Sequence, residues 1–240
     1  MNIPVVIFIR SYRNDLEWLK YCLRSIEKFV TGHAGVVVVV PEQDGVLFRA
    51  AGIEVQTTPE ADPGRGYLNQ QVTKIHADEF CPPECWILYV DSDCVFTAPM
   101  HVDDFFKDGK PILLHTPYAL LPKPPAMPWK ALTERCLGFE CHDETMRRHG
   151  AIMSSSELKD FREWFLANRG QTIDAHVGQL KYHDFSEFNV LGMWLWKFRH
   201  SSRSWIRTDV DPIPPLHLKQ GYSWNGVTPA IRAEMEKILA

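Results

Sequence analysis

The stretch "CWILYVDSDCVF", residues 85–96, places an apolar run directly before two aspartates. Apolar and aromatic residues fill positions 86–90, and Asp91 and Asp93 follow with only Ser92 between them. Two neighbouring carboxylates at the end of a buried strand repel each other and resist desolvation. The stretch therefore predicts a buried strand that ends at a site where another group offsets the negative charge.

Strand and helix patterns alternate along the first hundred residues. Continuous apolar runs predict buried strands at 3–9, 35–41, 53–58 and 86–90, and apolar residues at helical spacing predict helices at 14–30, 44–52 and 64–80. Asn14 or Asp15 supplies a cap for the first helix. This order is typical of a parallel sheet with helices on both faces, and ligands bind beyond the carboxyl ends of such strands.

Prolines change the character of the chain from about residue 111. Six of them fall between positions 111 and 128, so this part is expected to be mostly loop after a strand at 112–115. Two helices are expected next, the clearer at 154–170, followed by an apolar helix at 187–198, an irregular C-terminal portion and a short closing helix. Because no segment resembles a linker, residues 1–240 are expected to form one α/β domain with a smaller lobe.

Composition limits the classes of function. The 240 residues are 45% hydrophobic with a formal net charge of −4, which suits a soluble globular protein and gives no general case for nucleic-acid binding. Neither a secretory leader nor a run of about 18 apolar residues is present, so we expect a cytoplasmic protein with reduced thiols and no membrane span. Two loosely spaced cysteine pairs, Cys81 with Cys85 and Cys136 with Cys141, leave a zinc site or buried small hydrophobes as alternatives.

The aspartate pair has a metal-binding interpretation. Residues i and i+2 of an extended segment point the same way, so Asp91 and Asp93 are expected to face one point. A divalent cation at that point removes their repulsion, and a hard ion held by few carboxylates completes its shell with substrate phosphates. The alternative is a solvated turn in which the aspartates cap backbone N–H groups.

The segment "ILYVDSDCVF" resembles the D-x-D segment of nucleotide-sugar-dependent glycosyltransferases of the GT-A fold, and "GYLNQQVTKIHADEF" is similar to the helix that precedes it there. The resemblance implies a Rossmann-like GT-A fold, mainly a parallel central sheet flanked by helices, with residues 1–100 as the nucleotide-sugar-binding half and 101–240 as the acceptor-side half. It also implies Mn²⁺ or Mg²⁺, held chiefly by Asp93, against the diphosphate of a UDP-sugar. The resemblance further implies that Asp91 both contributes to metal binding and contacts the ribose, and that Ser92 is a donor contact.

The segment "PPLHLKQGYSW", residues 214–224, resembles the C-terminal histidine segment of glycogenin-like transferases. This implies that His217 is a third metal ligand and Lys219 a diphosphate contact, with Gly221 allowing close backbone approach. The sequence departs from the pattern, because Lys219 precedes Gly221 and Tyr-Ser-Trp replaces Lys-Pro-Trp. A half-buried loop histidine is the alternative for His217.

Donor contacts are expected from two further places. Arg10, Ser11 and Tyr12 follow the first strand, where GT-A enzymes hold the base and ribose, so Tyr12 can stack on a base and Arg10 can meet phosphate or base oxygens. Gln71 and Lys74 share a face of the helix at 64–80 at i, i+3 spacing. Surface loop residues and a solvated helix side are the alternatives.

Sugar transfer also needs an acidic group on the acceptor side. Glu187 is the first candidate, because it falls in the first turn of the helix at 187–198 if Ser186 is the cap, and the helix dipole favours its ionised form there. Asp184 is the second. Either residue can instead merely complement the helix end, and the sequence leaves inverting and retaining courses open.

The expected function is metal-dependent transfer of a sugar to a glycan, lipid-linked or small-molecule acceptor. The segment 194–207 interleaves cations with aromatics, which keeps a nucleic-acid acceptor such as a modified base as a lesser alternative. A nucleotidyltransferase is a rival, although it usually has a glycine-rich loop after the first strand, where Arg10-Ser11-Tyr12 contains none. A non-catalytic sugar-nucleotide-binding protein is the other alternative.

Overall fold

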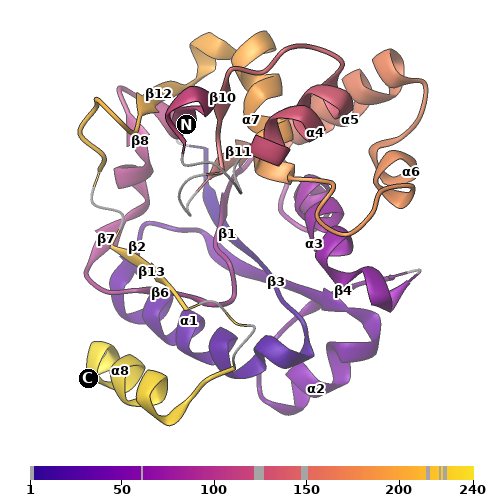
Figure 1. The fold of residues 1–240 in the computed structure, drawn as a ribbon. Coiled ribbons are helices and arrows are strands. Elements are labelled where there is room, and N and C mark those ends of the chain that lie inside the picture. The colour runs from indigo at the N-terminus through magenta and orange to yellow at the C-terminus, as the bar shows by residue number, and fades with distance from the viewer. Residues whose placement is uncertain are drawn as a thin grey trace.

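The central sheet of the computed structural model has the strand order β11-β5-β1-β3-β4 (Figure 1). The strands β1 (Val5–Arg10), β3 (Gly35–Pro41), β4 (Gln56–Thr58) and β5 (Trp86–Tyr89) are parallel, and β11 (Ile152–Ser154) joins β5 antiparallel. The structure describes residues 3–60, 62–121, 127–146, 151–214, 217–221, 223 and 226–240. This mostly parallel arrangement confirms the predicted α/β class and is compatible with a Rossmann-like fold.

Both faces of this sheet are buried, which explains the continuous apolar runs of its strands. On one face, Phe8 and Tyr89 pack among α3 (Gly66–Ile75), α5 (Ser155–Arg169) and α7 (Glu187–Phe198). On the other, Ile7 and Leu88 pack among α1 (Leu16–Phe29) and α2 (Gly45–Ala50). The two helix layers lie on opposite sides of the sheet in Figure 1.

The remaining described strands form smaller sheets. The strand β9 (Lys110–Pro117) pairs in parallel with β12 (Ser204–Arg207) and antiparallel with β10 (Asp143–Glu144) and β8 (Phe106–Lys107). The strand β6 (Cys94–Phe96) pairs with β13 (Leu218–Gln220), and β2 (Val30–Thr31) pairs with β7 (Met100–His101). The helix α4 (Met127–Leu137) contacts α7, and α6 (Ile173–Gly178) contacts α3 and α5. The helix α8 (Pro229–Leu239) packs on α1 (Figure 1).

Three sequence-based element predictions need correction. The helix expected at 64–80 ends at Ile75 and is followed by a 3-10 turn, Ala77–Glu79. The strand expected at 53–58 is paired only over Gln56–Thr58. The first of the two helices expected after the proline-rich part, α4, begins at Met127, earlier than expected, because a proline in the first helical turn loses no intrahelical hydrogen bond. By contrast, the capping box of Ser154 with Glu157 and the left-handed Gly170 are confirmed.

His76, which follows α3, makes the fold sensitive to pH. Its Nδ1 lies 2.7 Å from Glu79 Oε1 and its Nε2 lies 2.9 Å from Asp174 Oδ2 on α6. Burial disfavours the imidazolium, but the two carboxylates prevail and raise the pKa of His76. A pKa that is raised in the folded state contributes to folding stability. This contribution is fully present below the unfolded-state pKa of about 6.5 and is lost as pH rises through the folded-state pKa.

We therefore expect His76→Gln to lower the melting temperature at pH 5.5 by about 2 °C more than at pH 9. Asp174→Asn should reduce the same difference, because it removes one of the two carboxylates from the imidazolium. Thermal unfolding followed by circular dichroism at both pH values measures the effect. An equal loss at the two pH values would show that the ring contributes packing only.

Candidate functional site

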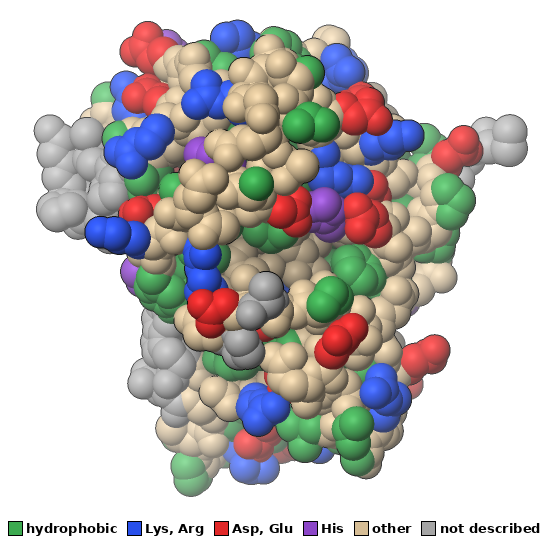
Figure 2. Space-filling view, turned by 90° about the vertical axis from the view of Figure 1, so that its right-hand side faces the viewer, with side chains coloured by type: hydrophobic (Ala, Val, Ile, Leu, Met, Phe, Trp, Pro, Cys, Tyr) green, Lys and Arg blue, Asp and Glu red, His purple; other side chains and the backbone are tan. Residues whose placement is uncertain are grey.

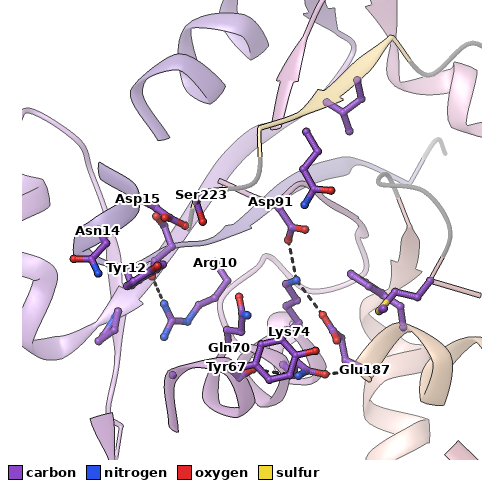
Figure 3. A pocket seen from close by; sticks show the side chains of 18 of the residues that line it. Arg10, Tyr12, Asn14, Asp15, Tyr67, Gln70, Lys74, Asp91, Glu187 and Ser223 are labelled. Carbon is purple, nitrogen blue, oxygen red and sulfur yellow. Dashed lines mark hydrogen bonds and ion pairs between the residues drawn. The ribbon is translucent and has the colours of Figure 1, made fainter. Parts of the chain in front are cut away.

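A cleft of about 1850 Å³ opens at the carboxyl edge of the central sheet. One wall consists of residues 10–15 after β1 and of Pro41, Gln43 and Asp44 at the end of β3, and Asp91 follows β5. The opposite side is built from one face of α3 and the start of α7, while part of the segment before α8 lies beside Asp15 and Asp93. The cleft thus lies where the sequence predicts ligands to bind, and Figure 3 shows the side chains that line it.

Lys74 connects three elements inside this cleft. Its Nζ lies 2.8 Å from Asp91 Oδ1 and 3.0 Å from Glu187 Oε1 (Figure 3), although Lys74 itself is buried. Burial disfavours the ammonium, but the attraction of Asp91 and Glu187 prevails and raises the pKa of Lys74 above its usual value. One charged lysine from α3 therefore holds the carboxylate after β5 and the carboxylate at the start of α7.

Gln71, one turn before Lys74, fixes the backbone of the same helix start. Its Oε1 accepts a hydrogen bond from the Glu187 N–H at 3.1 Å, and its Nε2 donates to the Tyr67 carbonyl at 3.2 Å. Ser186 occupies the expected cap position, but its side chain makes no capping bond. Gln71 supplies that bond from another helix, so both the backbone and the carboxylate of buried Glu187 are held by α3.

Asp91 and Asp93 occupy different positions. The strand β5 ends at Tyr89, and the Cys94 N–H donates to the Asp91 carbonyl at 3.0 Å, so a tight turn replaces the extended segment that the sequence suggested. The Asp91 side chain is 28% exposed and lines the cleft. Asp93 is buried, and its Oδ2 accepts from the Ser223 N–H at 3.0 Å. Asp91 therefore faces the cleft, while Asp93 anchors the C-terminal segment.

Asp15 joins this carboxylate group, although the sequence suggested only a cap. It makes no side-chain capping bond to α1, and instead its Oδ2 accepts from Ser92 Oγ at 2.8 Å. Burial and the charges of Asp93 and Asp91 raise the pKa of Asp15 to about 6. In the sequence, Asp15 has the position of an ordinary helix cap, and nothing else in the sequence marks it as part of a ligand site.

The segment after β1 presents two buried polar atoms to the cleft. Arg10 is ion-paired with Glu60 and also donates to the Ser11 carbonyl, and burial lowers the pKa of Arg10. Arg10 Nε and Ser11 Oγ are buried without a hydrogen-bond partner among the described residues. Tyr12 is 39% exposed. The three predicted donor residues are therefore together, with Tyr12 as the open side chain.

His217 and Lys219 of the C-terminal segment lie at the cleft, but they do not have the predicted metal and phosphate geometry. His217 is exposed and lines the cleft, but the described residues contain no group of three His, Cys, Asp or Glu side chains placed to hold a metal. Lys219 is ion-paired with Glu234 of α8. Asp184 is half-buried and lies outside the cleft lining. All six cysteines are free thiols, and within the described residues none belongs to such a metal group.

The lysines and arginines of the cleft are already paired. Among the described lining residues, each forms an ion pair: Arg10 with Glu60, Arg13 with Asp44, Lys74 with Asp91 and Glu187, and Lys219 with Glu234. Figure 2, which faces the side carrying α3 and α6, shows acidic and basic side chains interspersed over that face. The cleft therefore offers a ligand carboxylates and neutral groups, with little unpaired positive charge.

Gly221 permits close packing under the site. Its N–H donates to the Asp93 carbonyl at 2.7 Å, and a Cβ at this position would lie 2.2 Å from the Trp18 ring. We expect Gly221→Ala to lower the free energy of unfolding by about 1–3 kcal/mol, as overpacking does. Gly178→Ala is the matched control, since its Cβ would meet nothing within 4 Å. Equal urea midpoints for both variants would contradict the close packing.

Comparison with known proteins places the chain in a family. No described helix is long and apolar enough to cross a membrane. No curated protein matches the chain. Residues 2–224 match a family that is described as "Family of unknown function (DUF6492)". Because this match extends over most of the 240 residues, the protein belongs to that family, DUF6492.

Proposed function

We propose that the protein is a metal-dependent glycosyltransferase that moves a sugar from a nucleotide diphosphate sugar, a UDP-sugar, to an acceptor hydroxyl. The observation that carries the proposal is the bridge from Asp91 through Lys74 to Glu187. It joins a carboxylate at the sheet edge, where donor phosphates are expected, to a carboxylate at the start of α7 on the opposite wall. The D-x-D resemblance supports the same assignment.

The residues of the cleft fit a hard divalent cation. Asp15 and Asp91 line the cleft, and burial, with a smaller contribution from the charges of Asp93 and Asp91, raises the pKa of Asp15 to about 6. Carboxylate oxygens are the ligands that Mg²⁺ and Mn²⁺ prefer. Asp91, which faces the cleft, would hold the cation, and the cation would oppose the charge that develops as the diphosphate leaves.

The protein's own groups have separate roles in this proposal. Arg10 Nε and Ser11 Oγ offer unpartnered polar atoms to the nucleoside, and Tyr12 offers an exposed ring for the base. Glu187 orients the acceptor hydroxyl and, in an inverting course, takes its proton as the oxygen attacks the anomeric carbon. Lys74 holds the Glu187 carboxylate in place for this task through its ion pair.

Thermal unfolding in the presence of ligands tests the donor site. UDP with Mn²⁺ should raise the melting temperature by several degrees, because a ligand at about 100 times its Kd stabilises by about 2.7 kcal/mol. A comparable shift by nucleoside triphosphates but not by UDP would favour a nucleotidyltransferase. No shift with any nucleoside diphosphate and Mn²⁺ would overturn the donor-site assignment.

A further inference from the structure

An aromatic group stands beside Glu187 on the wall opposite the segment after β1. Tyr182 is 59% exposed, and its ring centroid lies 4.8 Å from that of Tyr67 and 4.2 Å from that of His183. All three line the cleft. Gln71 links them to the site, since it bonds both the Tyr67 carbonyl and the Glu187 N–H. We call these three residues, Tyr67, Tyr182 and His183, the aromatic wall.

The aromatic wall is held in place by the protein. Arg65, just before α3, donates to the carbonyls of Val177 at 2.8 Å and Leu180 at 2.7 Å, and also to that of Gly178. These bonds anchor the chain that leads to Tyr182. His183 adopts a left-handed backbone conformation at φ 67°, which is uncommon for a residue other than glycine. A ring that is both exposed and fixed needs little further ordering when it binds a ligand.

Charge around the aromatic wall disfavours an anionic ligand. Residues 146–214 contribute no lysine or arginine to the described cleft lining, but supply Met146, Tyr182, His183, Glu187, Phe188, Thr208, Ile213 and Pro214. A phosphate backbone would meet the Glu187 carboxylate there, and the Lys74 ammonium that contacts this carboxylate is already shared with Asp91. A ligand with an apolar face, hydroxyl groups and no charge meets rings, the Thr208 hydroxyl and one carboxylate instead. A pyranose ring has this combination of groups.

We propose that the aromatic wall is the acceptor subsite and that it takes a neutral pyranose. The C–H face of the sugar packs against Tyr182, and one sugar hydroxyl donates a hydrogen bond to Glu187. This inference rests on the proposed glycosyltransferase function. It narrows the acceptor from a glycan, a lipid-linked molecule or another small molecule to a carbohydrate. It predicts that nucleic acid is not the acceptor.

Saturation-transfer difference NMR tests the inference, with the methyl pyranosides of glucose, galactose and N-acetylglucosamine as probes. At least one should bind the wild type in the presence of UDP and Mn²⁺. Tyr182→Ala should weaken that binding about fivefold, as the loss of about 1 kcal/mol of ring contact predicts, whereas Tyr182→Phe should retain it. Tyr12→Ala is the matched donor-side variant and should weaken binding of UDP instead.

The outcomes separate this inference from the proposed function. UDP binding without binding of any pyranoside would overturn the acceptor subsite and leave the donor site standing. Pyranoside binding that depends on Tyr182 in a protein that never binds UDP would support a sugar site and overturn the transferase proposal. Loss of UDP affinity in Tyr182→Ala would assign the aromatic wall to the nucleotide, and Tyr182-dependent binding of a short oligothymidylate would assign it to nucleic acid. Either result contradicts the inference.

Discussion

Replacing Lys74 by methionine should lower the free energy of unfolding by about 3 kcal/mol. Methionine retains an apolar stem of similar length, so the loss comes from the ammonium. Without it, the Glu187 carboxylate stays buried with no cation in contact, and Asp91 loses the same partner. Breaking a buried ion pair from one side is costly because the remaining charge is not solvated. Urea unfolding of both proteins at pH 7 measures the difference.

A double-mutant cycle separates charge from packing. Glu187→Gln in the Lys74→Met background removes the buried carboxylate, so the double variant should be more stable than Lys74→Met alone. A stability of Lys74→Met equal to that of the wild type would contradict the account, because it would mean that Lys74 does not bridge the two carboxylates in solution.

Replacing Asp91 by asparagine should weaken binding of UDP with Mn²⁺ by about 100-fold or more, as removal of one charged ligand does. The fold should persist, because Lys74 keeps its contact with Glu187 and Asp91 is partly exposed. Isothermal titration calorimetry with UDP, with and without Mn²⁺, measures the effect.

Two variants serve as controls for Asp91→Asn. Asp103→Asn changes an exposed carboxylate outside the cleft lining and should bind UDP like the wild type. Asp93→Asn should weaken UDP binding and also lower stability, because Asp93 anchors Ser223. Unchanged affinity in Asp91→Asn would remove this residue from the donor site.

The central strands of the sheet were predictable because β1, β3 and β5 are largely buried on both faces and therefore have unbroken apolar sequences, whereas the edge strand β4 does not. The strand at 35–41 and the helix at 187–198 have the predicted bounds. The small sheet around β9 was not predicted, since its pairing with β12 joins segments about ninety residues apart, as Thr116 and Thr208 illustrate with a separation of 92. Such pairing leaves no local pattern.

The location of the candidate site was predictable from the sequence, but the contacts between its residues were not. Asp91, Lys74, Gln71 and Glu187 were each expected at the cleft, and the structure brings them together. Their mutual bonds were not expected, because Lys74 and Glu187 are 113 positions apart. The turn after β5 also separates Asp93 from the cleft in a way that the D-x-D spacing alone does not indicate. The likeness to GT-A enzymes therefore stays a prediction that activity must test.

Release of UDP from nucleotide sugars tests the central claim most directly. The protein would be incubated with a panel of UDP-sugars and Mn²⁺, and UDP and free sugar would be measured by mass spectrometry, with water serving as the slow acceptor. We expect one UDP-sugar to be cleaved by the wild type, with the release abolished by EDTA and by Asp91→Asn. Folded protein that releases no UDP from any nucleotide sugar, or an Asp91→Asn variant that releases it at the wild-type rate, would contradict the account.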